Sequence, residues 1–299
     1  MIVALTVALT LLGPRDTLAV RDIPLGRGEV LRTTSVGSGR PVVLIPGLFG
    51  AAFGYRRIVG PLAGLGYRAI VIEPLGFGWS AHPRGANYSL TAQTARVAAV
   101  LDSLGIHQAV IIAHSTGASL ALRLAYQRPD LVDGILSIDG GPAESAATPG
   151  LRRAMRFGGM LTKALLQPDA FRSEVRREIV ANSSDTSWVS PEVVAGYTEG
   201  ATADLSGAID AWQGMAKSVE SESLLDRLGD CRVPVRLLVG AVPHQSGVGA
   251  EQIALLAQRL PDFRVDSVPG SGQYIQEEQP DAVLAALGKL AAATRYAAR

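Results

Sequence analysis

Residues 109–127 read AVIIAHSTGASLALRLAYQ, an apolar run followed by a turn of small residues and then a helical pattern. The β-branched run predicts a buried strand, and the residues after the turn predict an amphipathic helix. Ala113 and Gly117 lie two residues to either side of Ser115 and leave room for a tight turn, although glycine is more usual at the first position. A strand, a strained turn and a helix N-terminus in this order can present a nucleophilic hydroxyl. We therefore predict Ser115 to be a nucleophile.

A second loop is expected to complete this site. Residues 44–50 read LIPGLFG, a strand end followed by a glycine-flanked turn, at the distance before the serine that suits an oxyanion loop. The backbone amides of Leu48 and Thr116 are the predicted donors to a carbonyl oxygen. One such donor contributes about 3 kcal/mol where it has been measured. The alternative is that the glycines only turn the chain.

Most of the remaining sequence alternates between short apolar runs and helical patterns, which predicts an α/β fold with a mainly parallel sheet. Strands are predicted at residues 41–45, 68–72, 109–113, 134–138, 233–239 and 263–268, with an antiparallel edge at 22–25 and 29–35. Helices are predicted at residues 90–104, 116–127, 252–260 and 280–293, the first of them capped by Ser89.

Length and charge exclude several classes of protein. The 299 residues suit one large domain or a core with an insertion. A net charge of +1, from 28 basic and 27 acidic residues, gives no reason to expect a nucleic-acid partner. Cys231 is the single cysteine, so neither an internal disulfide nor a multi-cysteine metal site is possible. No close set of histidine, cysteine and carboxylate suggests a metal, and no glycine-rich phosphate loop suggests a nucleotide cofactor.

The N-terminal segment, residues 1–20, is open to two interpretations. Its first twelve residues are apolar apart from two threonines, and Arg15 is the first charged residue. This resembles an export signal with a cleavage site near Thr17 to Ala19, although no basic residue precedes the apolar run. The alternative is an N-terminal element packed on the core. The sequence leaves an exported or membrane-associated protein and a cytoplasmic one equally open, with membrane association possible only through this segment.

Residues 142–228 interrupt the alternation, because they contain helical patterns and turns but no convincing buried strand. We interpret them as a helical cap inserted into a core formed by residues 21–141 and 229–299. Large apolar residues of the cap are Met155, Phe157, Met160, Leu165, Phe171, Trp188, Tyr197, Trp212 and Met215. Most could simply hold the cap helices together, but some are expected to face a ligand. The residues predicted to bind substrate are Phe49, His114, Trp188, Trp212 and Tyr274.

Four motifs together resemble the α/β-hydrolase superfamily, in its branch of small, capped esterases, epoxide hydrolases and haloperoxidases. They are the loop at residues 46–50, the turn around Ser115, residues 270–280, and a DxxGxGxS-like pattern made by Glu73, Gly76, Gly78 and Ser80. The resemblance covers nearly everything after about Ile23. It implies an eight-stranded, mainly parallel sheet flanked by helices, a helical cap, and no cofactor. Glu73 replaces the aspartate of the pattern, whose role in relatives is mainly architectural.

Two departures from the family pattern affect the catalytic residues. Gln273 stands where relatives have the catalytic histidine, and Pro243 where they have the acid. A glutamine forms hydrogen bonds but does not accept a proton near neutral pH. Loss of the histidine costs about a millionfold in turnover in a well-studied serine protease, or about 8 kcal/mol. A histidine-to-glutamine change made to trap a substrate would give the same residue, but would not explain Pro243 unless Asp139 is the acid.

Two other residues are candidates for the missing roles. His244 follows the vacant acid position and could reach Ser115 as the base, or it could be a solvent-facing loop residue. Asp139 ends the strand before the cap, where some members of the family carry their acid, or it could be a turn residue before two glycines. Glu277 and Glu278 are expected to form an exposed helix start.

The functional prediction is a cofactor-free enzyme, resembling serine hydrolases, that acts on a small apolar ester, lactone or related carbonyl compound with weakened or non-standard catalysis. The catalytic candidates are Ser115, His244, Asp139 and Gln273. One alternative is a lyase, isomerase or cyclase that uses the oxyanion hole without an acyl intermediate. The other is a binding protein that has lost turnover, as in the gibberellin receptors of the same superfamily. The sequence makes no prediction of oligomeric state.

Overall fold

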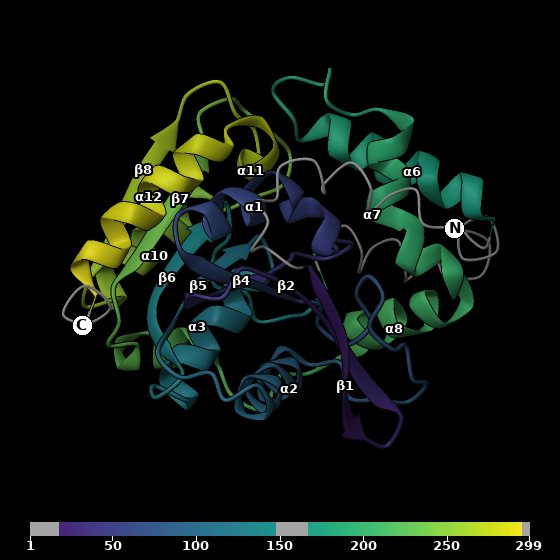
Figure 1. The fold of residues 1–299 in the computed structure, drawn as a ribbon, viewed down its shortest axis with the longest axis horizontal. Helices are drawn as coiled ribbons and strands as arrows, with labels where there is room; N and C mark the ends of the chain where they lie inside the picture. Colours follow the sequence, from purple (N-terminus) through teal and green to yellow (C-terminus); the bar gives the residue numbers. More distant parts are fainter. Residues whose placement is uncertain (1–17, 148–166, 295–299) are drawn as a thin grey trace.

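A single eight-stranded sheet organises the structure, a computed structural model that describes residues 18–147 and 167–294 (Figure 1). Its strands are β1 (Ala19–Gly26), β2 (Glu29–Val36), β3 (Arg40–Ile45), β4 (Tyr67–Ile72), β5 (Ala109–His114), β6 (Val132–Ile138), β7 (Val235–Gly240) and β8 (Phe263–Val268). Their order is β1-β2-β4-β3-β5-β6-β7-β8. The pairs β1·β2 and β2·β4 are antiparallel and the others parallel. The predicted mainly parallel, eight-stranded sheet is confirmed. Most of the predicted N-terminal segment lies outside the described residues.

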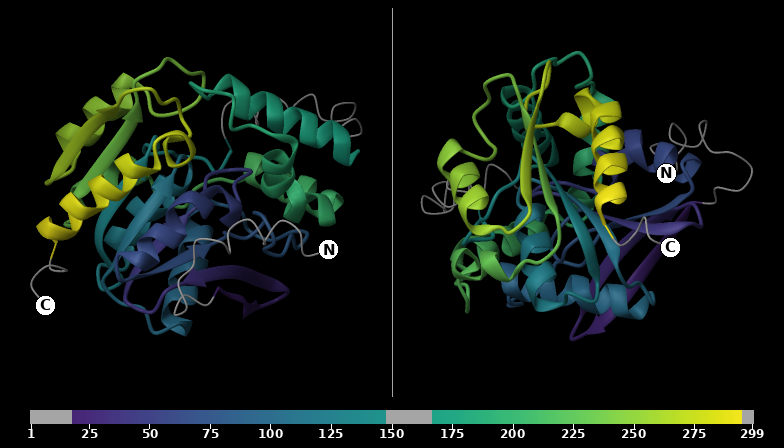
Figure 2. Two further views of the ribbon diagram at one scale, coloured as in Figure 1. Left: turned by 45° about the horizontal axis from the view of Figure 1, so that its top comes forward. Right: turned by 90° about the vertical axis from the view of Figure 1, so that its left-hand side faces the viewer.

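Helices cover both faces of the sheet, as the two apolar cores show. Alternate residues of β3 point to opposite faces, so Val42 and Leu44 pack with α1 (Arg56–Gly64) and α12 (Pro280–Ala293). Val43 and Ile45 belong to the other core, with α2 (Leu90–Ser103), α3 (Gly117–Gln127) and α10 (Ala250–Arg259). In the right-hand view of Figure 2, α10 and α12 lie on opposite sides of β7 and β8. The parallel strands are buried on both faces, which explains their continuous apolar sequences.

The described parts of the segment between β6 and β7 contain helices and loops but no strand. The segment contains α6 (Pro168–Ala181), α7 (Pro191–Ala203), α8 (Leu205–Lys217), α9 (Leu224–Arg227) and the short 3-10 helix η3 (Leu228–Asp230). Figure 1 places α6, α7 and α8 together, on the opposite side of the molecule from α12. Met155, Phe157, Met160 and Leu165 lie outside the described residues. The boundaries of a separate cap at residues 142 and 228 stay a prediction.

Glu73 connects the loop after β4 to the loop after β3. Its buried carboxylate accepts hydrogen bonds from the amides of Ala52 and Trp79, both at 2.7 Å. Gly78 has φ +50°, and a Cβ there would lie 2.5 Å from the same carboxyl group. Burial raises the pKa of Glu73 to about 7. The motif therefore fixes the turn that precedes α1, and only glycine fits beside the glutamate.

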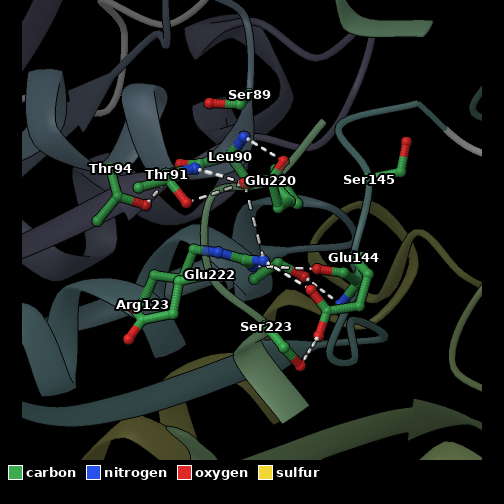
Figure 3. Close-up of polar contacts among 12 residues, drawn as sticks. Ser89, Leu90, Thr91, Thr94, Arg123, Glu144, Ser145, Glu220, Glu222 and Ser223 are labelled. Atoms are coloured by element: carbon green, nitrogen blue, oxygen red, sulfur yellow. Dashed lines mark hydrogen bonds and ion pairs between the residues drawn. The ribbon is translucent and has the colours of Figure 1, made fainter. Parts of the chain in front are cut away.

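A buried arginine ties the helical segment to the core at both of its ends (Figure 3). Arg123, on α3, donates to Ala143 O at 3.0 Å and to Glu144 at 3.2 Å, just after β6. Its guanidinium also lies 4.0 Å from the carboxylate of Glu220, beyond α8. That carboxylate accepts hydrogen bonds from the Leu90 and Thr91 amides, at 2.7 and 2.9 Å, at the start of α2. The entering and returning chains are thus held at one point.

No helix within the described ranges has both the length and the apolar character needed to cross a membrane.

Candidate active site

Ser115 lies on the sharp turn between β5 and α3. Its backbone has φ +49°, in the left-handed region that costs a non-glycine residue free energy. The turn is held because the Ser115 amide donates to Ile138 O at 3.0 Å and its carbonyl accepts from the Ala118 amide at 3.0 Å. A Cβ at Gly117 would lie 2.6 Å from Ile45 O, so a larger residue would not fit. The predicted strand, turn and helix are present in the predicted order.

The loop after β3 brings a second set of amides beside this turn. Its tight geometry includes a hydrogen bond from the Gly50 amide to Gly47 O at 2.8 Å and a left-handed Phe49 with φ +61°. A Cβ on Gly47 would lie 2.9 Å from the Cβ of Ser115, so the two loops are in contact. Within the described ranges, neither the Leu48 nor the Thr116 amide donates to a protein acceptor. No side chain caps α3, which begins directly after Thr116.

Gln273 lies next to the serine, as predicted. Its Nε2 donates to Ser115 Oγ at 3.4 Å, a long hydrogen bond, and its side chain is buried. Its backbone amide donates to Asn182 O at 2.8 Å, at the end of α6. A Cβ on the preceding Gly272 would lie 2.3 Å from that same Asn182 oxygen. The helical segment therefore fixes the residue that replaces the expected histidine.

His114 packs beside Gln273 but has a different partner. Its Nε2 lies 3.2 Å from the backbone carbonyl of Gln273, so the ring nitrogen is the donor in this contact. Burial lowers the pKa of His114 to about 4, against the opposing effect of that hydrogen bond. The ring is therefore neutral at pH 7, and its ring centroid lies 5.5 Å from that of Tyr274.

His244 and Asp139 contact each other, and the structure does not bring His244 to Ser115. The Nδ1 of His244 lies 2.8 Å from Val242 O, and its Nε2 lies 2.6 Å from Asp139 Oδ2. Both ring nitrogens are occupied, because the loop after β7 folds back over the end of β6. Asp139 is fully buried with φ +45°, and burial raises its pKa to about 6 against the opposing effect of His244. The predicted contact between base and serine is absent from this conformation.

The predicted ligand-binding aromatic residues form two groups, each joining core loops to the helical segment. Phe49 packs edge-on against Trp212, with ring centroids 4.8 Å apart, and Trp212 also contacts Phe171 at 5.1 Å. Trp188 lies 5.7 Å from Tyr274 by the same measure. The buried indole Nε1 of Trp188 has no hydrogen-bond partner in the described parts of the chain.

Sequence reasoning was wrong about the acidic pair in α11 (Ile275–Glu278). Glu277 is completely buried and pairs with Arg56, and it accepts a hydrogen bond from Tyr197 at 2.8 Å. Glu278 accepts from the amides of Ser184 and Asp185 at 2.6 and 2.8 Å. Their partners come from α1 and the helical segment, distant in sequence, so no local pattern could have identified them. Across the described residues, no group of three or more histidine, cysteine and carboxylate side chains is placed to hold a metal ion.

Comparison with known proteins gives a consistent result. The family model for the alpha/beta hydrolase fold matches residues 40–183. An epoxide hydrolase of Caballeronia sordidicola is 26% identical over 272 residues, covering 90% of this chain and 73% of that protein. A 2-(acetamidomethylene)succinate hydrolase of Mesorhizobium japonicum is 24% identical over 275 residues, covering 91% and 95%. The solved structure of the epoxide hydrolase CorEH, at 18% identity, superposes with a TM-score of 0.76 over 92% of this chain and 99% of that one.

Proposed function

Because this chain belongs to the α/β-hydrolase superfamily, we propose that it is a cofactor-free, serine-dependent enzyme acting on small apolar esters, lactones or related carbonyl compounds. The observation that carries the proposal is the convergence of Ser115, on its strained turn, with the amides of Leu48 and Thr116, which have no acceptor among the described residues. Two such donors next to a serine hydroxyl are the arrangement needed to stabilise an oxyanion.

In the proposed reaction, Ser115 Oγ attacks the carbonyl carbon and forms a tetrahedral intermediate. The negative charge on the former carbonyl oxygen is held by the Leu48 and Thr116 amides, with added support from the N-terminus of α3. Collapse expels the alcohol oxygen, which takes up a proton and leaves an acyl group on Ser115. Water then hydrolyses the acyl group.

The weak point of this reaction is the acceptor for the serine proton. Gln273 orients Ser115 Oγ but is a neutral amide, and His244 has both ring nitrogens engaged. His114 is a weak base, since burial lowers its pKa to about 4. Serine hydrolases stripped of triad residues retain about 10³–10⁴-fold acceleration over water from the oxyanion hole and substrate binding. We therefore propose slow turnover, with the base supplied by water or by the substrate.

The surrounding side chains support an apolar substrate that carries a hydrogen-bond acceptor. Phe49 and Tyr274, both partly exposed, offer aromatic surface between the core loops and the helical segment, and the buried Trp212 packs against Phe49. The Nε1 of Trp188 is a buried donor without an acceptor among the described residues, which is costly unless a ligand or water supplies one.

A second candidate function is ligand binding without turnover. Its support is that, among the described residues, the side chain hydrogen-bonded to Ser115 Oγ is Gln273 and no histidine occupies that place. The same observation leaves room for a lyase, isomerase or cyclase that uses the amides for an enolate.

A substrate panel separates these functions. Purified protein is incubated with p-nitrophenyl acetate, butyrate and octanoate and with simple lactones, alongside Ser115→Ala and the control Ser187→Ala, which alters an exposed serine. The proposal predicts slow hydrolysis that is lost in Ser115→Ala and kept in the control. Hydrolysis that survives Ser115→Ala would overturn it. A ligand that raises the melting temperature and is recovered unchanged would favour the binding function.

A further inference from the structure

The loop at residues 241–249 closes over the end of β6 through a contact made by His244. A neutral imidazole cannot satisfy both oxygens that face its ring. His244 Nδ1 faces Val242 O at 2.8 Å and His244 Nε2 faces Asp139 Oδ2 at 2.6 Å. A backbone carbonyl can only accept, and a carboxylate can only accept unless it is protonated. A neutral imidazole has one N–H, so it can satisfy only one of these two oxygens.

A second proton must therefore lie in the pair. With Nδ1–H directed at Val242 O, an unprotonated Nε2 would set its lone pair against a carboxylate oxygen at 2.6 Å, which is repulsive. Asp139 Oδ2 accepts no hydrogen bond from the described residues, so the 2.6 Å contact is explained by charge, with an imidazolium facing a carboxylate. We propose that this proton makes His244 and Asp139 an imidazolium–carboxylate ion pair, and that the pair acts as a latch holding the 241–249 loop closed.

Packing around the pair is tight. A Cβ on Gly247 would lie 2.6 Å from Asp139 Oδ2 and 2.7 Å from His244 Nε2, so only glycine fits there. The Val248 amide approaches Asp139 Oδ1 at 3.4 Å, and Asp139 itself holds a left-handed backbone with φ +45°. A surface depression of about 300 Å³, lined by residues 240–249, leaves the loop accessible to solvent for proton exchange.

The charged groups that face the loop are acidic. Asp139 directly follows β6. Glu178, on α6, accepts a hydrogen bond from Ser246 Oγ at 3.0 Å. Glu278 accepts a hydrogen bond from the Gly272 amide in the neighbouring segment. The residue of α10 that contacts the loop is the uncharged Gln252. No arginine or lysine of the described ranges pairs with these loop residues. An acidic surrounding favours retention of the proton.

Opening the loop at high pH therefore releases one proton. An exposed imidazole has a pKa of about 6.5, so above that pH the open state holds one proton fewer than the closed state. Each rise of one pH unit should then increase the equilibrium constant for loop opening about tenfold, and a fall in pH should favour the closed loop. An open loop would free both Asp139 and His244 to take part at Ser115. That consequence rests on the proposed function, whereas the latch does not.

Hydrogen exchange tests the latch without any enzyme assay. Deuterium uptake of a peptide spanning residues 241–249 is measured by mass spectrometry from pH 6 to 9 and corrected for the intrinsic exchange rate. Protection in the unmodified protein should fall with pH, approaching about tenfold per unit above pH 6.5. Peptides from residues 109–127 serve as the internal control and should keep pH-independent protection.

Three variants test which side chains hold the proton of the latch. Asp139→Asn should keep the loop closed and abolish the pH slope, because a carboxamide N–H can donate to a neutral Nε2. His244→Ala should expose the loop at every pH. Glu178→Gln should keep the full slope, which separates the pair from the nearby carboxylate. A flat profile in the unmodified protein, or an unchanged slope in Asp139→Asn, would overturn the latch. Neither result would alter whether Ser115 is required for hydrolysis.

Discussion

Replacing Gln273 by histidine should restore part of the missing catalytic power. The position is already fixed, because the Gln273 amide donates to Asn182 O at 2.8 Å and its side chain reaches Ser115 Oγ at 3.4 Å. A positioned general base contributes about 10²–10⁴-fold, equivalent to about 3–5 kcal/mol of barrier. Asp139 is engaged by His244, so the new imidazole lacks a free carboxylate to orient it. We therefore expect Gln273→His to lie near the lower end, with about a hundredfold gain in ester hydrolysis.

Combining that change with His244→Ala should raise the rate further, by about tenfold or more, because Asp139 becomes available to the new histidine. The assay is steady-state hydrolysis of p-nitrophenyl butyrate by the unmodified protein, both single variants and the double variant. Gln273→Asn is the matched control, since it keeps an amide at the position and should give no gain. If all variants fold and hydrolyse the ester at the same rate, the view that the site lacks only a base would be refuted.

Other predictions concern the scaffold, and urea unfolding measures each of them. Gly78→Ala should destabilise the fold by at least about 2 kcal/mol, because its Cβ would lie 2.5 Å from the Glu73 carboxyl group. Gly85→Ala is the control, with positive φ but open space, and should cost only the strain of a left-handed alanine, about 1–2 kcal/mol; equal losses in the two variants would contradict the steric argument. Because burial raises the pKa of Glu73 to about 7, its contribution to the free energy of unfolding should fall by about 0.8 kcal/mol between pH 6.5 and pH 8. Glu73→Gln should lack that component, and an unchanged pH profile in this variant would contradict the assignment. Glu220→Gln should lower the free energy of unfolding by about 1–3 kcal/mol, because it weakens the hydrogen bonds at the start of α2 and removes the negative charge beside buried Arg123. A loss below about 0.5 kcal/mol would contradict this role.

Features that are determined by short stretches of sequence could be predicted. The β-branched run before Ser115 and the small residues around it indicated the strand and turn, and both are present. Ser89 was identified as a helix cap from its position alone, and it accepts a hydrogen bond from the Ala92 amide at 3.2 Å. Gln273 was assigned to the site by the resemblance of residues 270–280 to the family pattern, which has the catalytic histidine at this position. Periodicity and local turn chemistry carry this kind of information.

Contacts between distant segments could not be predicted. The engagement of His244 by Asp139 depends on how the loop after β7 folds, which its composition does not specify. Glu277 looked like an exposed helix start, yet it is buried against Arg56 and Tyr197, which lie 221 and 80 residues earlier in the sequence. Asn182 carries no motif, although its carbonyl positions Gln273. Such pairings are set by tertiary packing, which overrides local propensity.

The most direct measurement is mass spectrometry of the protein after incubation with a fluorophosphonate. A serine hydroxyl beside the Leu48 and Thr116 amides should give one covalent adduct per chain, formed slowly because no base activates the serine. The adduct should map to the tryptic peptide of residues 97–123 and disappear in Ser115→Ala. Folded protein that stays unlabelled after prolonged incubation, or that is labelled elsewhere, would contradict the assignment of Ser115 as the nucleophile.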